Sequence, residues 1–270
     1  MLNKGGFVLL APQRQKEIYR LMMENGEVQL SDLAKRFEVS VMTIHRDIEK
    51  LEKVGRARRV HGGAVIPQQH WTPEPFKKKI SSNIELKEAI AKTVVPMFKP
   101  NTTVFLDAGS TALEIAKVLQ ANYTDNLTIC TPDVHIAMTL YENHRFNVLI
   151  LGGVVENQNG SITSHFALDM LKKLHADVAF IGCDGVTVQD GAMAANFPQI
   201  PIKQMMLERS MKSVLVTDST KIGRISVTSI APIAAFDFIA TDQHVSNEFA
   251  EFVRNSGCKL ILPNEEDDQI

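Results

Sequence analysis

The sequence is poor in cysteine and has no long apolar run, and each shortage excludes a class of protein. Its three cysteines, Cys130, Cys183 and Cys258, are too widely spaced for a disulfide framework or a cysteine-rich metal site. We interpret them as reduced thiols and expect a cytoplasmic protein with no metal and no cofactor. No stretch approaches the roughly 18 consecutive apolar residues that a membrane-spanning helix needs, so we expect no membrane partner.

The small net charge of −2 hides an uneven distribution. Residues 1–66 contain 12 Lys and Arg against 8 Asp and Glu, a net charge of +4. Residues 67–270 contain 17 against 23, a net charge of −6. A basic head on an acidic body favours a head that binds a polyanion, although chance variation of surface charge would give the same split.

The basic head has the pattern of three helices followed by a hairpin. Apolar residues recur at helical spacing in three segments, and Ser31 and Ser40 stand where the second and third helices would begin. In the third segment Ile44, Ile48 and Leu51 share one face. The following run RARRVHGGAVI predicts a small β-hairpin with a Gly-Gly turn. This order predicts a winged helix-turn-helix domain over residues 1–66.

The start of the third predicted helix carries side chains that suit contact with double-stranded DNA. A recognition helix places its first turns in the major groove, and arginines on a wing suit phosphate contact or minor-groove insertion. We expect Asp47 to orient an arginine or to tie this helix to its neighbour. The candidate DNA-binding residues are Ser31, Ser40, Met42, Thr43, His45, Arg46, Lys50, Arg56, Arg58, Arg59 and His61.

Two other interpretations of the head are weaker. A helix with incidental solvated polar residues would explain the third segment alone, but not the complete order of three helices and a basic hairpin. An RNA-binding module is disfavoured because the head lacks the aromatic platforms that readers of single-stranded RNA use.

Beyond the head the sequence predicts a linker and then an α/β domain. Residues 67–83 combine three prolines with a lysine run and show no periodicity, which indicates a tether or arm. The lysines could contact DNA, but we favour solvated lysines. From residue 84 to 270, strands that are apolar throughout alternate with helices. This alternation predicts a Rossmann-like, mainly parallel sheet covered on both faces.

Small and polar residues gather where the predicted strands end, which is the edge at which parallel sheets bind ligands. The segment LDAGST places hydroxyl and amide groups at a helix N-terminus, where they suit a phosphate. Lysines and carboxylates at the other ends suit a phosphate and sugar hydroxyls. The candidate effector-binding residues are Asp107, Gly109, Ser110, Thr111, Asp133, Gly152, Gly153, Asp184, Gly185, Lys203 and Lys221. Each alone could be an ordinary connector or surface residue, so their convergence is the decisive point.

The head closely resembles the DNA-binding domain of DeoR-family bacterial transcriptional regulators. The family core VS..TIRRD...LE..G...R.HGGA is matched from Val39 to Ala64, with His45 where the family usually has arginine. The resemblance implies operator binding, and the histidine changes which operator sequence fits.

The body resembles the effector domain of the same family through LDAGST, LGG, GCDG and DSTKIG, with Asp133 in a TPD segment where the family has VTN. The resemblance implies a fold like ribose-5-phosphate isomerase and a phosphorylated sugar as ligand. It also implies that Ser110 and Thr111 hold the phosphate and that Asp184 and Lys203 face the sugar.

From these features we expect a DNA-binding transcriptional regulator, a repressor of a carbohydrate-metabolism operon, controlled by a phosphorylated sugar. We expect a homo-oligomer, a dimer or a tetramer, because a single small head contacts little DNA. The alternative is a sugar-phosphate isomerase-like enzyme. The run around Asp184 lacks the acidic cluster of those isomerases, so we expect a sensor rather than an enzyme.

Overall fold

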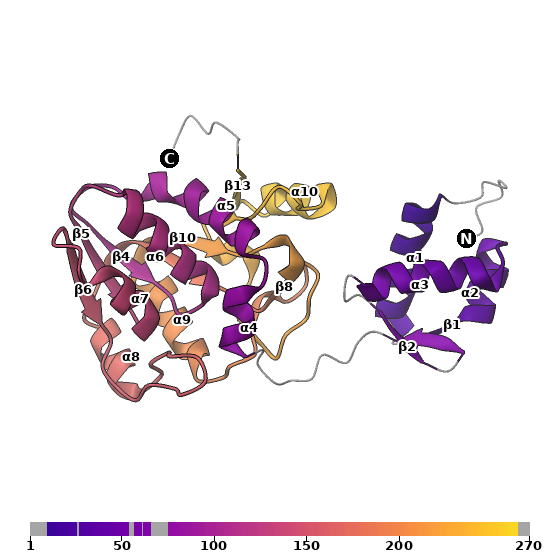
Figure 1. Cartoon of the computed structure of the whole chain (residues 1–270), viewed down its shortest axis with the longest axis horizontal. Helices are drawn as coiled ribbons and strands as arrows, with labels where there is room; N and C mark the ends of the chain where they lie inside the picture. The colour runs from indigo at the N-terminus through magenta and orange to yellow at the C-terminus, as the bar shows by residue number, and fades with distance from the viewer. Residues whose placement is uncertain (1–9, 26, 54–56, 61, 66–74, 264–270) are drawn as a thin grey trace. The chain divides into compact units, whose positions relative to one another are not determined.

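The computed structural model describes residues 10–25, 27–53, 57–60, 62–65 and 75–263 of the chain. The chain divides into two compact units, Met1–His70 and Trp71–Ile270 (Figure 1). None of the helices in the described ranges combines the length and the apolar character that crossing a bilayer requires.

The first unit is a winged helix-turn-helix domain, as predicted. Its elements are α1 (Ala11–Asn25), β1 (Glu27–Gln29), α2 (Leu30–Phe37), α3 (Val41–Lys53), β2 (Arg58–Val60) and β3 (Gly63–Val65). The strands form an antiparallel sheet in the order β1-β3-β2. Ile18, Met22, Ile44 and Ile48 are fully buried, so the apolar faces of α1 and α3 meet in one small core.

The two serines that were expected to cap helices behave differently. The Ser40 hydroxyl accepts a hydrogen bond from the backbone N–H of Thr43 at 3.1 Å, which confirms its place before α3. The expected capping role of Ser31 is wrong, because α2 already begins at Leu30 and its N-cap residue is Gln29. Leu30 is buried, so the chain turns directly from β1 into the helix to bury that side chain.

The second unit is built on a seven-stranded sheet in which every pairing is parallel. The strand order is β13-β12-β10-β7-β4-β5-β6. The sheet strands are β4 (Thr102–Leu106), β5 (Leu127–Thr131), β6 (Phe146–Ile150), β7 (Ala176–Gly182), β10 (Ser210–Val216), β12 (Phe238–Ala240) and β13 (Lys259–Ile261). The predicted parallel α/β domain is therefore confirmed.

Helices cover both faces of this sheet because its strands are apolar on both sides (Figure 1). One face packs against α5 (Ile84–Val94), α6 (Ser110–Asn122) and α7 (Val134–Leu140). The other face packs against α8 (His165–Leu171), α9 (Gln199–Glu208) and α10 (Asn247–Asn255). Single-turn 3₁₀ helices lie at η1 (Val95–Met97), η2 (Ser219–Lys221) and η3 (Ile233–Ala235).

Two features of this unit differ from the sequence prediction. A second, antiparallel sheet in the order β11-β9-β8 is formed by β8 (Gly185–Thr187), β9 (Gly191–Ala194) and β11 (Thr228–Ala231). Part of the expected tether is also folded: α4 (Phe76–Ser81) lies within residues 67–83, and its Phe76 is buried against the sheet-facing core. Residues 67–74 of that tether, like the acidic C-terminal residues 264–270, lie outside the described ranges.

The strand order creates a reversal point between β4 and β7. The chain runs outward from β4 through β5 to β6 and then returns to form β7 on the other side of β4. Connections on the two sides lie on opposite faces, so a crevice opens where the carboxyl ends of β4 and β7 meet. Asp107 follows β4 and Asp184 follows β7, which brings two of the candidate effector residues to this point.

Candidate functional site

Six DNA-binding candidates lie on α3 or directly before its first residue. Ser40, Met42, Arg46 and Lys50 are exposed, and Met42 keeps 62% of its surface accessible. Thr43 and His45 are half-buried, and the Thr43 hydroxyl lies 2.9 Å from that of Ser40. At the start of a recognition helix, an exposed arginine suits hydrogen bonds to a base edge, and an exposed methionine suits contact with a thymine methyl group. Contact with DNA stays a prediction for each of them.

The remaining DNA-binding candidates lie on α2 and on the wing. Ser31 is exposed in the first turn of α2, and Arg58 is exposed on β2. Arg59 on the wing donates from Nε to a carboxylate oxygen of Glu52 at 2.6 Å. Glu52 lies on α3, so this contact keeps the arginine close to the recognition helix. Arg56 and His61 lie outside the described residues.

Asp47 fixes the position of α3 rather than contacting DNA. Its carboxylate accepts a hydrogen bond from Nε of Arg14 at 2.6 Å and from the side-chain amide of Gln15 at 2.7 Å. Arg14 and Asp47 are both buried, at 6% and 3% exposure. The expectation that Asp47 ties its helix to a neighbour is therefore confirmed, and the neighbour is α1.

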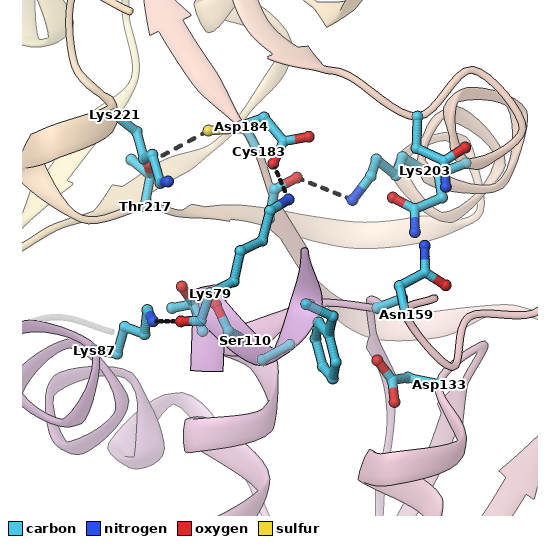
Figure 2. Close-up of a pocket in the computed structure, with 18 of the residues that line it drawn as sticks. Lys79, Lys87, Ser110, Asp133, Asn159, Cys183, Asp184, Lys203, Thr217 and Lys221 are labelled. Carbon is cyan, nitrogen blue, oxygen red and sulfur yellow. Dashed lines mark hydrogen bonds and ion pairs between the residues drawn. The ribbon is translucent and has the colours of Figure 1, made fainter. Parts of the chain in front are cut away.

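A cavity opens at the carboxyl ends of β4 and β7, where the reversal of strand order predicts one. Seven of the effector candidates line it: Gly109, Ser110, Thr111, Asp133, Asp184, Lys203 and Lys221. They come from widely separated segments, so the fold brings together what the sequence keeps apart. Figure 2 shows Lys87 and Lys221 on one side of the cavity and Asp133 and Asn159 on the other, with Lys79 between them.

One side of the cavity suits a phosphate. Gly109, Ser110 and Thr111 line it at the start of α6, a helix of 13 residues with Gly109 as its N-cap. The helix N-terminus offers backbone N–H groups and the positive end of the helix dipole, and the serine and threonine add hydroxyls. Lys87 and Lys221 line the same cavity and add positive charge.

A buried ion pair forms the floor of the crevice. Nζ of Lys203, on α9, donates to the carboxylate of Asp107 and to the carbonyl oxygen of Gly182 at 3.1 Å. Asp107 also accepts a hydrogen bond from the backbone N–H of Gly182 at 3.0 Å. Lys203 lines the cavity, whereas Asp107 lies beneath it and holds the lysine in place.

A second ion pair crosses the cavity and was not expected from the sequence. Lys79, on α4, donates to a carboxylate oxygen of Asp184. The other oxygen of Asp184 accepts from the backbone N–H of Ala195 at 2.9 Å. Burial by itself would raise the pKa of Asp184, but the charge and hydrogen bond of Lys79, with the Ala195 amide, lower it to about 2. The lysine that we expected to be solvated is thus part of the site.

Helix α4 is anchored at both ends by contacts within the second unit. Nζ of Lys87 donates to the carbonyl oxygens of Lys79 and of Ser82, the latter at 2.5 Å, and so satisfies the C-terminal end of α4. The Phe76 ring lies 4.8 Å from the His135 ring of α7. Sequence could have singled out Lys87, because it lies on the same face of α5 as Ile90, Ala91 and Val94.

A network of amide side chains forms the wall opposite Lys87 and Lys221 (Figure 2). Glu156 accepts hydrogen bonds from Thr163, from Asn159 at 2.9 Å and from Asn196 at 2.7 Å. Burial would raise the pKa of Glu156, but these hydrogen bonds outweigh it and lower the pKa below its usual value. Gln199 donates to the Ser161 hydroxyl at 3.0 Å. No sequence motif pointed to these residues.

Three glycines among the effector candidates do not line the cavity. Gly152 and Gly153 let the start of α8 approach: the Gly152 carbonyl accepts from the Ser164 hydroxyl at 3.1 Å, and a Cβ on Gly153 would meet that hydroxyl. A Cβ on Gly185 would meet the carbonyl oxygen of Arg224. Their small size serves packing between segments, and the approach of a ligand to Gly152 and Gly153 stays a prediction.

The described residues contain no group of three or more His, Cys, Asp or Glu side chains that could hold a metal ion.

Comparisons with known proteins agree for both units. Residues 14–70 match the family model for the DeoR-like helix-turn-helix domain, and residues 82–243 match the DeoR C-terminal sensor domain. The HTH-type transcriptional regulator GolR of Listeria innocua is 32% identical over 250 residues, covering 93% of this chain and 98% of that protein. The putative aga operon transcriptional repressor of Escherichia coli O157:H7 is 31% identical, covering 94% of each chain.

Among solved structures, ribose 5-phosphate isomerase A from Neisseria gonorrhoeae matches part of this chain. The identity is 16%, the TM-score is 0.37, and the match covers 54% of this chain and 56% of that one. This likeness is too distant to indicate an activity.

Proposed function

Because the chain belongs to the DeoR family of transcriptional regulators, we propose that it represses a carbohydrate-metabolism operon and that a phosphorylated sugar controls its affinity for operator DNA. The relatives named as an HTH-type transcriptional regulator and as a putative aga operon transcriptional repressor match over nearly their whole length. A repressor acts on chromosomal DNA, so we also infer a cytoplasmic location and double-stranded operator DNA as its partner. We propose that the protein needs no cofactor and that the sugar phosphate is its effector.

The observation that carries the effector proposal is the two-sided cavity at the ends of β4 and β7. One side offers the N-terminus of α6 with two hydroxyls and two lysines, which together suit a phosphate dianion. The other side offers carboxylates and amides, which suit the hydroxyl groups of a sugar. A small molecule with a phosphate at one end and several hydroxyls at the other fits both sides.

Helix α4 can transmit ligand binding in the cavity to the DNA-binding head. It is the first described element after residues 66–74, which lead from the head to the second unit. A ligand that interacts with Asp184 competes with Lys79 for the same carboxylate and thereby shifts α4. Such a shift changes operator affinity only if the ligand binds the two arrangements of α4 unequally.

We propose that the protein acts as a homo-oligomer, a dimer or a tetramer. The described part of the head offers one recognition helix and one short wing, which cover only a single half-site of duplex DNA. Pairing of heads across repeated half-sites would give the specificity that a repressor needs.

An isomerase-like enzyme was the alternative, and the family assignment sets it aside. The electrostatics of the site agree with a sensor. A general base works best when its pKa lies near the working pH, whereas Lys79 and the Ala195 amide help to hold the pKa of Asp184 at about 2. Such a carboxylate is a hydrogen-bond acceptor and a poor proton abstractor.

The proposal is tested with the full-length protein in two steps. A thermal-shift screen of ribose 5-phosphate, glucose 6-phosphate, fructose 6-phosphate, galactose 6-phosphate and glucosamine 6-phosphate should find at least one that raises the melting temperature. The same compound should release the protein from a duplex that carries the upstream sequence of its own operon. Lys221→Ala should weaken both effects about tenfold or more, and Lys117→Ala, an exposed lysine on α6, should change neither.

Stabilisation by none of these compounds would overturn the effector proposal. Equal affinity for the upstream duplex and for random duplex at every salt concentration would overturn the repressor proposal. The salt series is needed because phosphate contacts dominate unspecific binding and weaken steeply with salt.

A further inference from the structure

One carboxylate oxygen in the cavity has no hydrogen-bond partner among the residues that the structure describes. Asp133 follows β5 and is completely buried, yet it lines the cavity. Its Oδ1 caps α7, accepting hydrogen bonds from the backbone N–H groups of His135 at 2.8 Å and Ile136 at 3.3 Å. Its Oδ2 makes no hydrogen bond with any group among the described residues.

The helix cap accounts for only one of the two carboxylate oxygens of Asp133. An asparagine or a serine caps a helix as well as an aspartate does, because one acceptor oxygen suffices. A buried carboxylate oxygen without a donor costs free energy comparable to a lost hydrogen bond to a charged group. A second carboxylate oxygen at a buried cap is therefore costly unless something outside the described residues satisfies it.

The surroundings of Oδ2 favour a bound molecule over a protein partner. Asp133 pairs in an isolated β-bridge with Ser161, whose hydroxyl is held by Asn159 and Gln199. Asn159 and Gln199 both line the cavity, as Asp133 does. Figure 2 shows Asp133 and Asn159 on the side of the cavity away from Lys87 and Lys221. The unpaired oxygen thus belongs to the side that suits the sugar and not the phosphate.

We infer that Asp133 selects the effector by accepting, through Oδ2, a hydrogen bond from a hydroxyl or an ammonium group on the sugar part of the ligand. This inference rests on the proposed function and names what the sugar must carry. A carboxylate has no hydrogen to donate when it is ionised, so it accepts from a donor and repels an acceptor at the same place. Asp133 therefore discriminates against a sugar phosphate in which that donor is missing, since Oδ2 then stays buried and unpaired.

Burial raises the pKa of Asp133 above its usual value. The backbone N–H groups of His135 and Ile136 and the ring of His135 favour the ionised form and offset this effect only in part. A donor from the ligand would add to that second group of effects. The Phe76 ring packs on the ring of His135, the residue that donates to Oδ1, so Asp133 lies close to the anchor of α4. The donor contact is thereby placed beside the element that we propose to carry the signal.

Two substitutions isolate Oδ2, because each keeps an acceptor for the cap of α7. Asp133→Asn replaces Oδ2 with a donor, and Asp133→Ser removes the group. The matched control is Asp242→Asn, which alters a buried aspartate whose two oxygens accept from Ser219 and His244 and which does not line the cavity. Circular dichroism and melting curves of all three establish that they fold.

The probes are the sugar phosphate of the panel that binds the wild-type full-length protein most tightly, its singly deoxygenated analogues, its amino analogues and inorganic phosphate. Titration calorimetry should find one deoxy analogue that binds the wild type about 10- to 100-fold more weakly than the parent. Asp133→Ser should bind the parent and that analogue equally. Asp133→Asn should bind a ligand with an ammonium group more weakly than Asp133→Ser does, because two donors then face each other, whereas a hydroxyl can turn and accept from the amide. The amino analogue at the same carbon distinguishes an ammonium from a hydroxyl donor. Affinity for inorganic phosphate should not change.

Undiminished discrimination in both Asp133 variants would overturn this inference and leave the sugar-phosphate proposal intact. Equal loss of affinity for parent, deoxy analogue and inorganic phosphate would also overturn it, because Asp133 would then only support the cavity. Absence of binding of every sugar phosphate to the wild type would overturn the proposed function, and this inference with it.

Discussion

At the scale of single residues, the side chains of the head that are expected to contact DNA are distinct from those that hold its helices together. Asp47 stands directly beside Arg46 in the sequence, yet the carboxylate of Asp47 is buried against α1 while Arg46 is exposed. A helix turns by about 100° per residue, which is why neighbours in sequence can lie on different faces. The sequence could predict both roles, because a carboxylate is unsuited to a phosphate and an arginine is suited to one.

Replacement of Arg46 should test whether the exposed side of α3 contacts the bases of the operator. Arg46→Ala is expected to weaken operator binding by about 1–3 kcal/mol if the guanidinium contacts a guanine edge with two hydrogen bonds. Fluorescence anisotropy with the operator duplex gives the change, and sugar-phosphate affinity should stay as in the wild type. Arg254→Ala, an exposed arginine on α10, controls for loss of a positive charge; an effect of equal size there would mean that Arg46 does not contact the bases.

Replacement of Asp47 should affect stability instead. Asp47→Ala leaves Arg14 and Gln15 without the buried acceptor that they share, and breaking a buried ion pair costs about 3–5 kcal/mol. Chemical denaturation followed by circular dichroism should show the head unfolding at lower denaturant, while the second unit keeps its own transition. A head as stable as that of the wild type would show that the pair contributes nothing to the fold.

At the scale of elements, α4 is where the sequence was least informative. Three prolines and a lysine run indicate a tether, and the six residues of α4 are too few to show a helical period. The helix is held by tertiary contacts, namely Phe76 in the core and Lys87 at its C-terminal end. Other elements were predictable, because α3 has a helical period and the strands of the parallel sheet are apolar runs that alternate with helices. Contacts between distant segments, such as Lys79 with Asp184, leave no local pattern.

Lys79 should couple ligand binding to the head. Lys79→Gln keeps a polar side chain, one atom shorter, but removes the charge that holds Asp184, so α4 loses its link to the cavity as it would when a ligand binds. We expect operator affinity without sugar phosphate to fall by about fivefold or more, and the further fall on adding sugar phosphate to shrink. Lys77→Gln, on an exposed position of the same helix, should leave both values unchanged. If Lys79→Gln retains the full response, α4 does not carry the signal.

The same ion pair should appear in the acid stability of the second unit. The pKa of Asp184 lies at about 2 in the folded protein against an ordinary 3.8, so the unfolded chain binds more protons between these values. The stabilisation, about 2 kcal/mol, is complete above pH 4 and is lost as the pH falls towards 2. Urea denaturation at pH 5, 4 and 3 measures it, and Lys79→Gln should flatten this part of the pH dependence. An equal slope in the variant would mean that other groups cause it.

At the scale of the whole molecule, the order of helices and strands along the chain determines where the cavity lies. Alternation of apolar strands and helices predicts a parallel sheet, and a parallel sheet binds ligands at the carboxyl ends of its strands. That logic correctly brought seven candidates into one cavity. It could not supply the amide wall around Glu156, because those residues come from loops whose path depends on packing.

A two-unit sensor must also obey reciprocity, which gives a test that needs no mutation. If a sugar phosphate lowers operator affinity by some factor, operator DNA must lower sugar-phosphate affinity by the same factor, commonly about 5- to 150-fold. Calorimetric titration with and without saturating operator duplex measures the second factor, and duplex titration with and without sugar phosphate measures the first. In Arg46→Ala, duplex at the wild-type saturating concentration should have a smaller effect on sugar-phosphate affinity, because less of the protein is bound. Release of DNA by a sugar phosphate whose own affinity ignores the duplex would mean that it acts outside the cavity, and the coupling through α4 would be refuted.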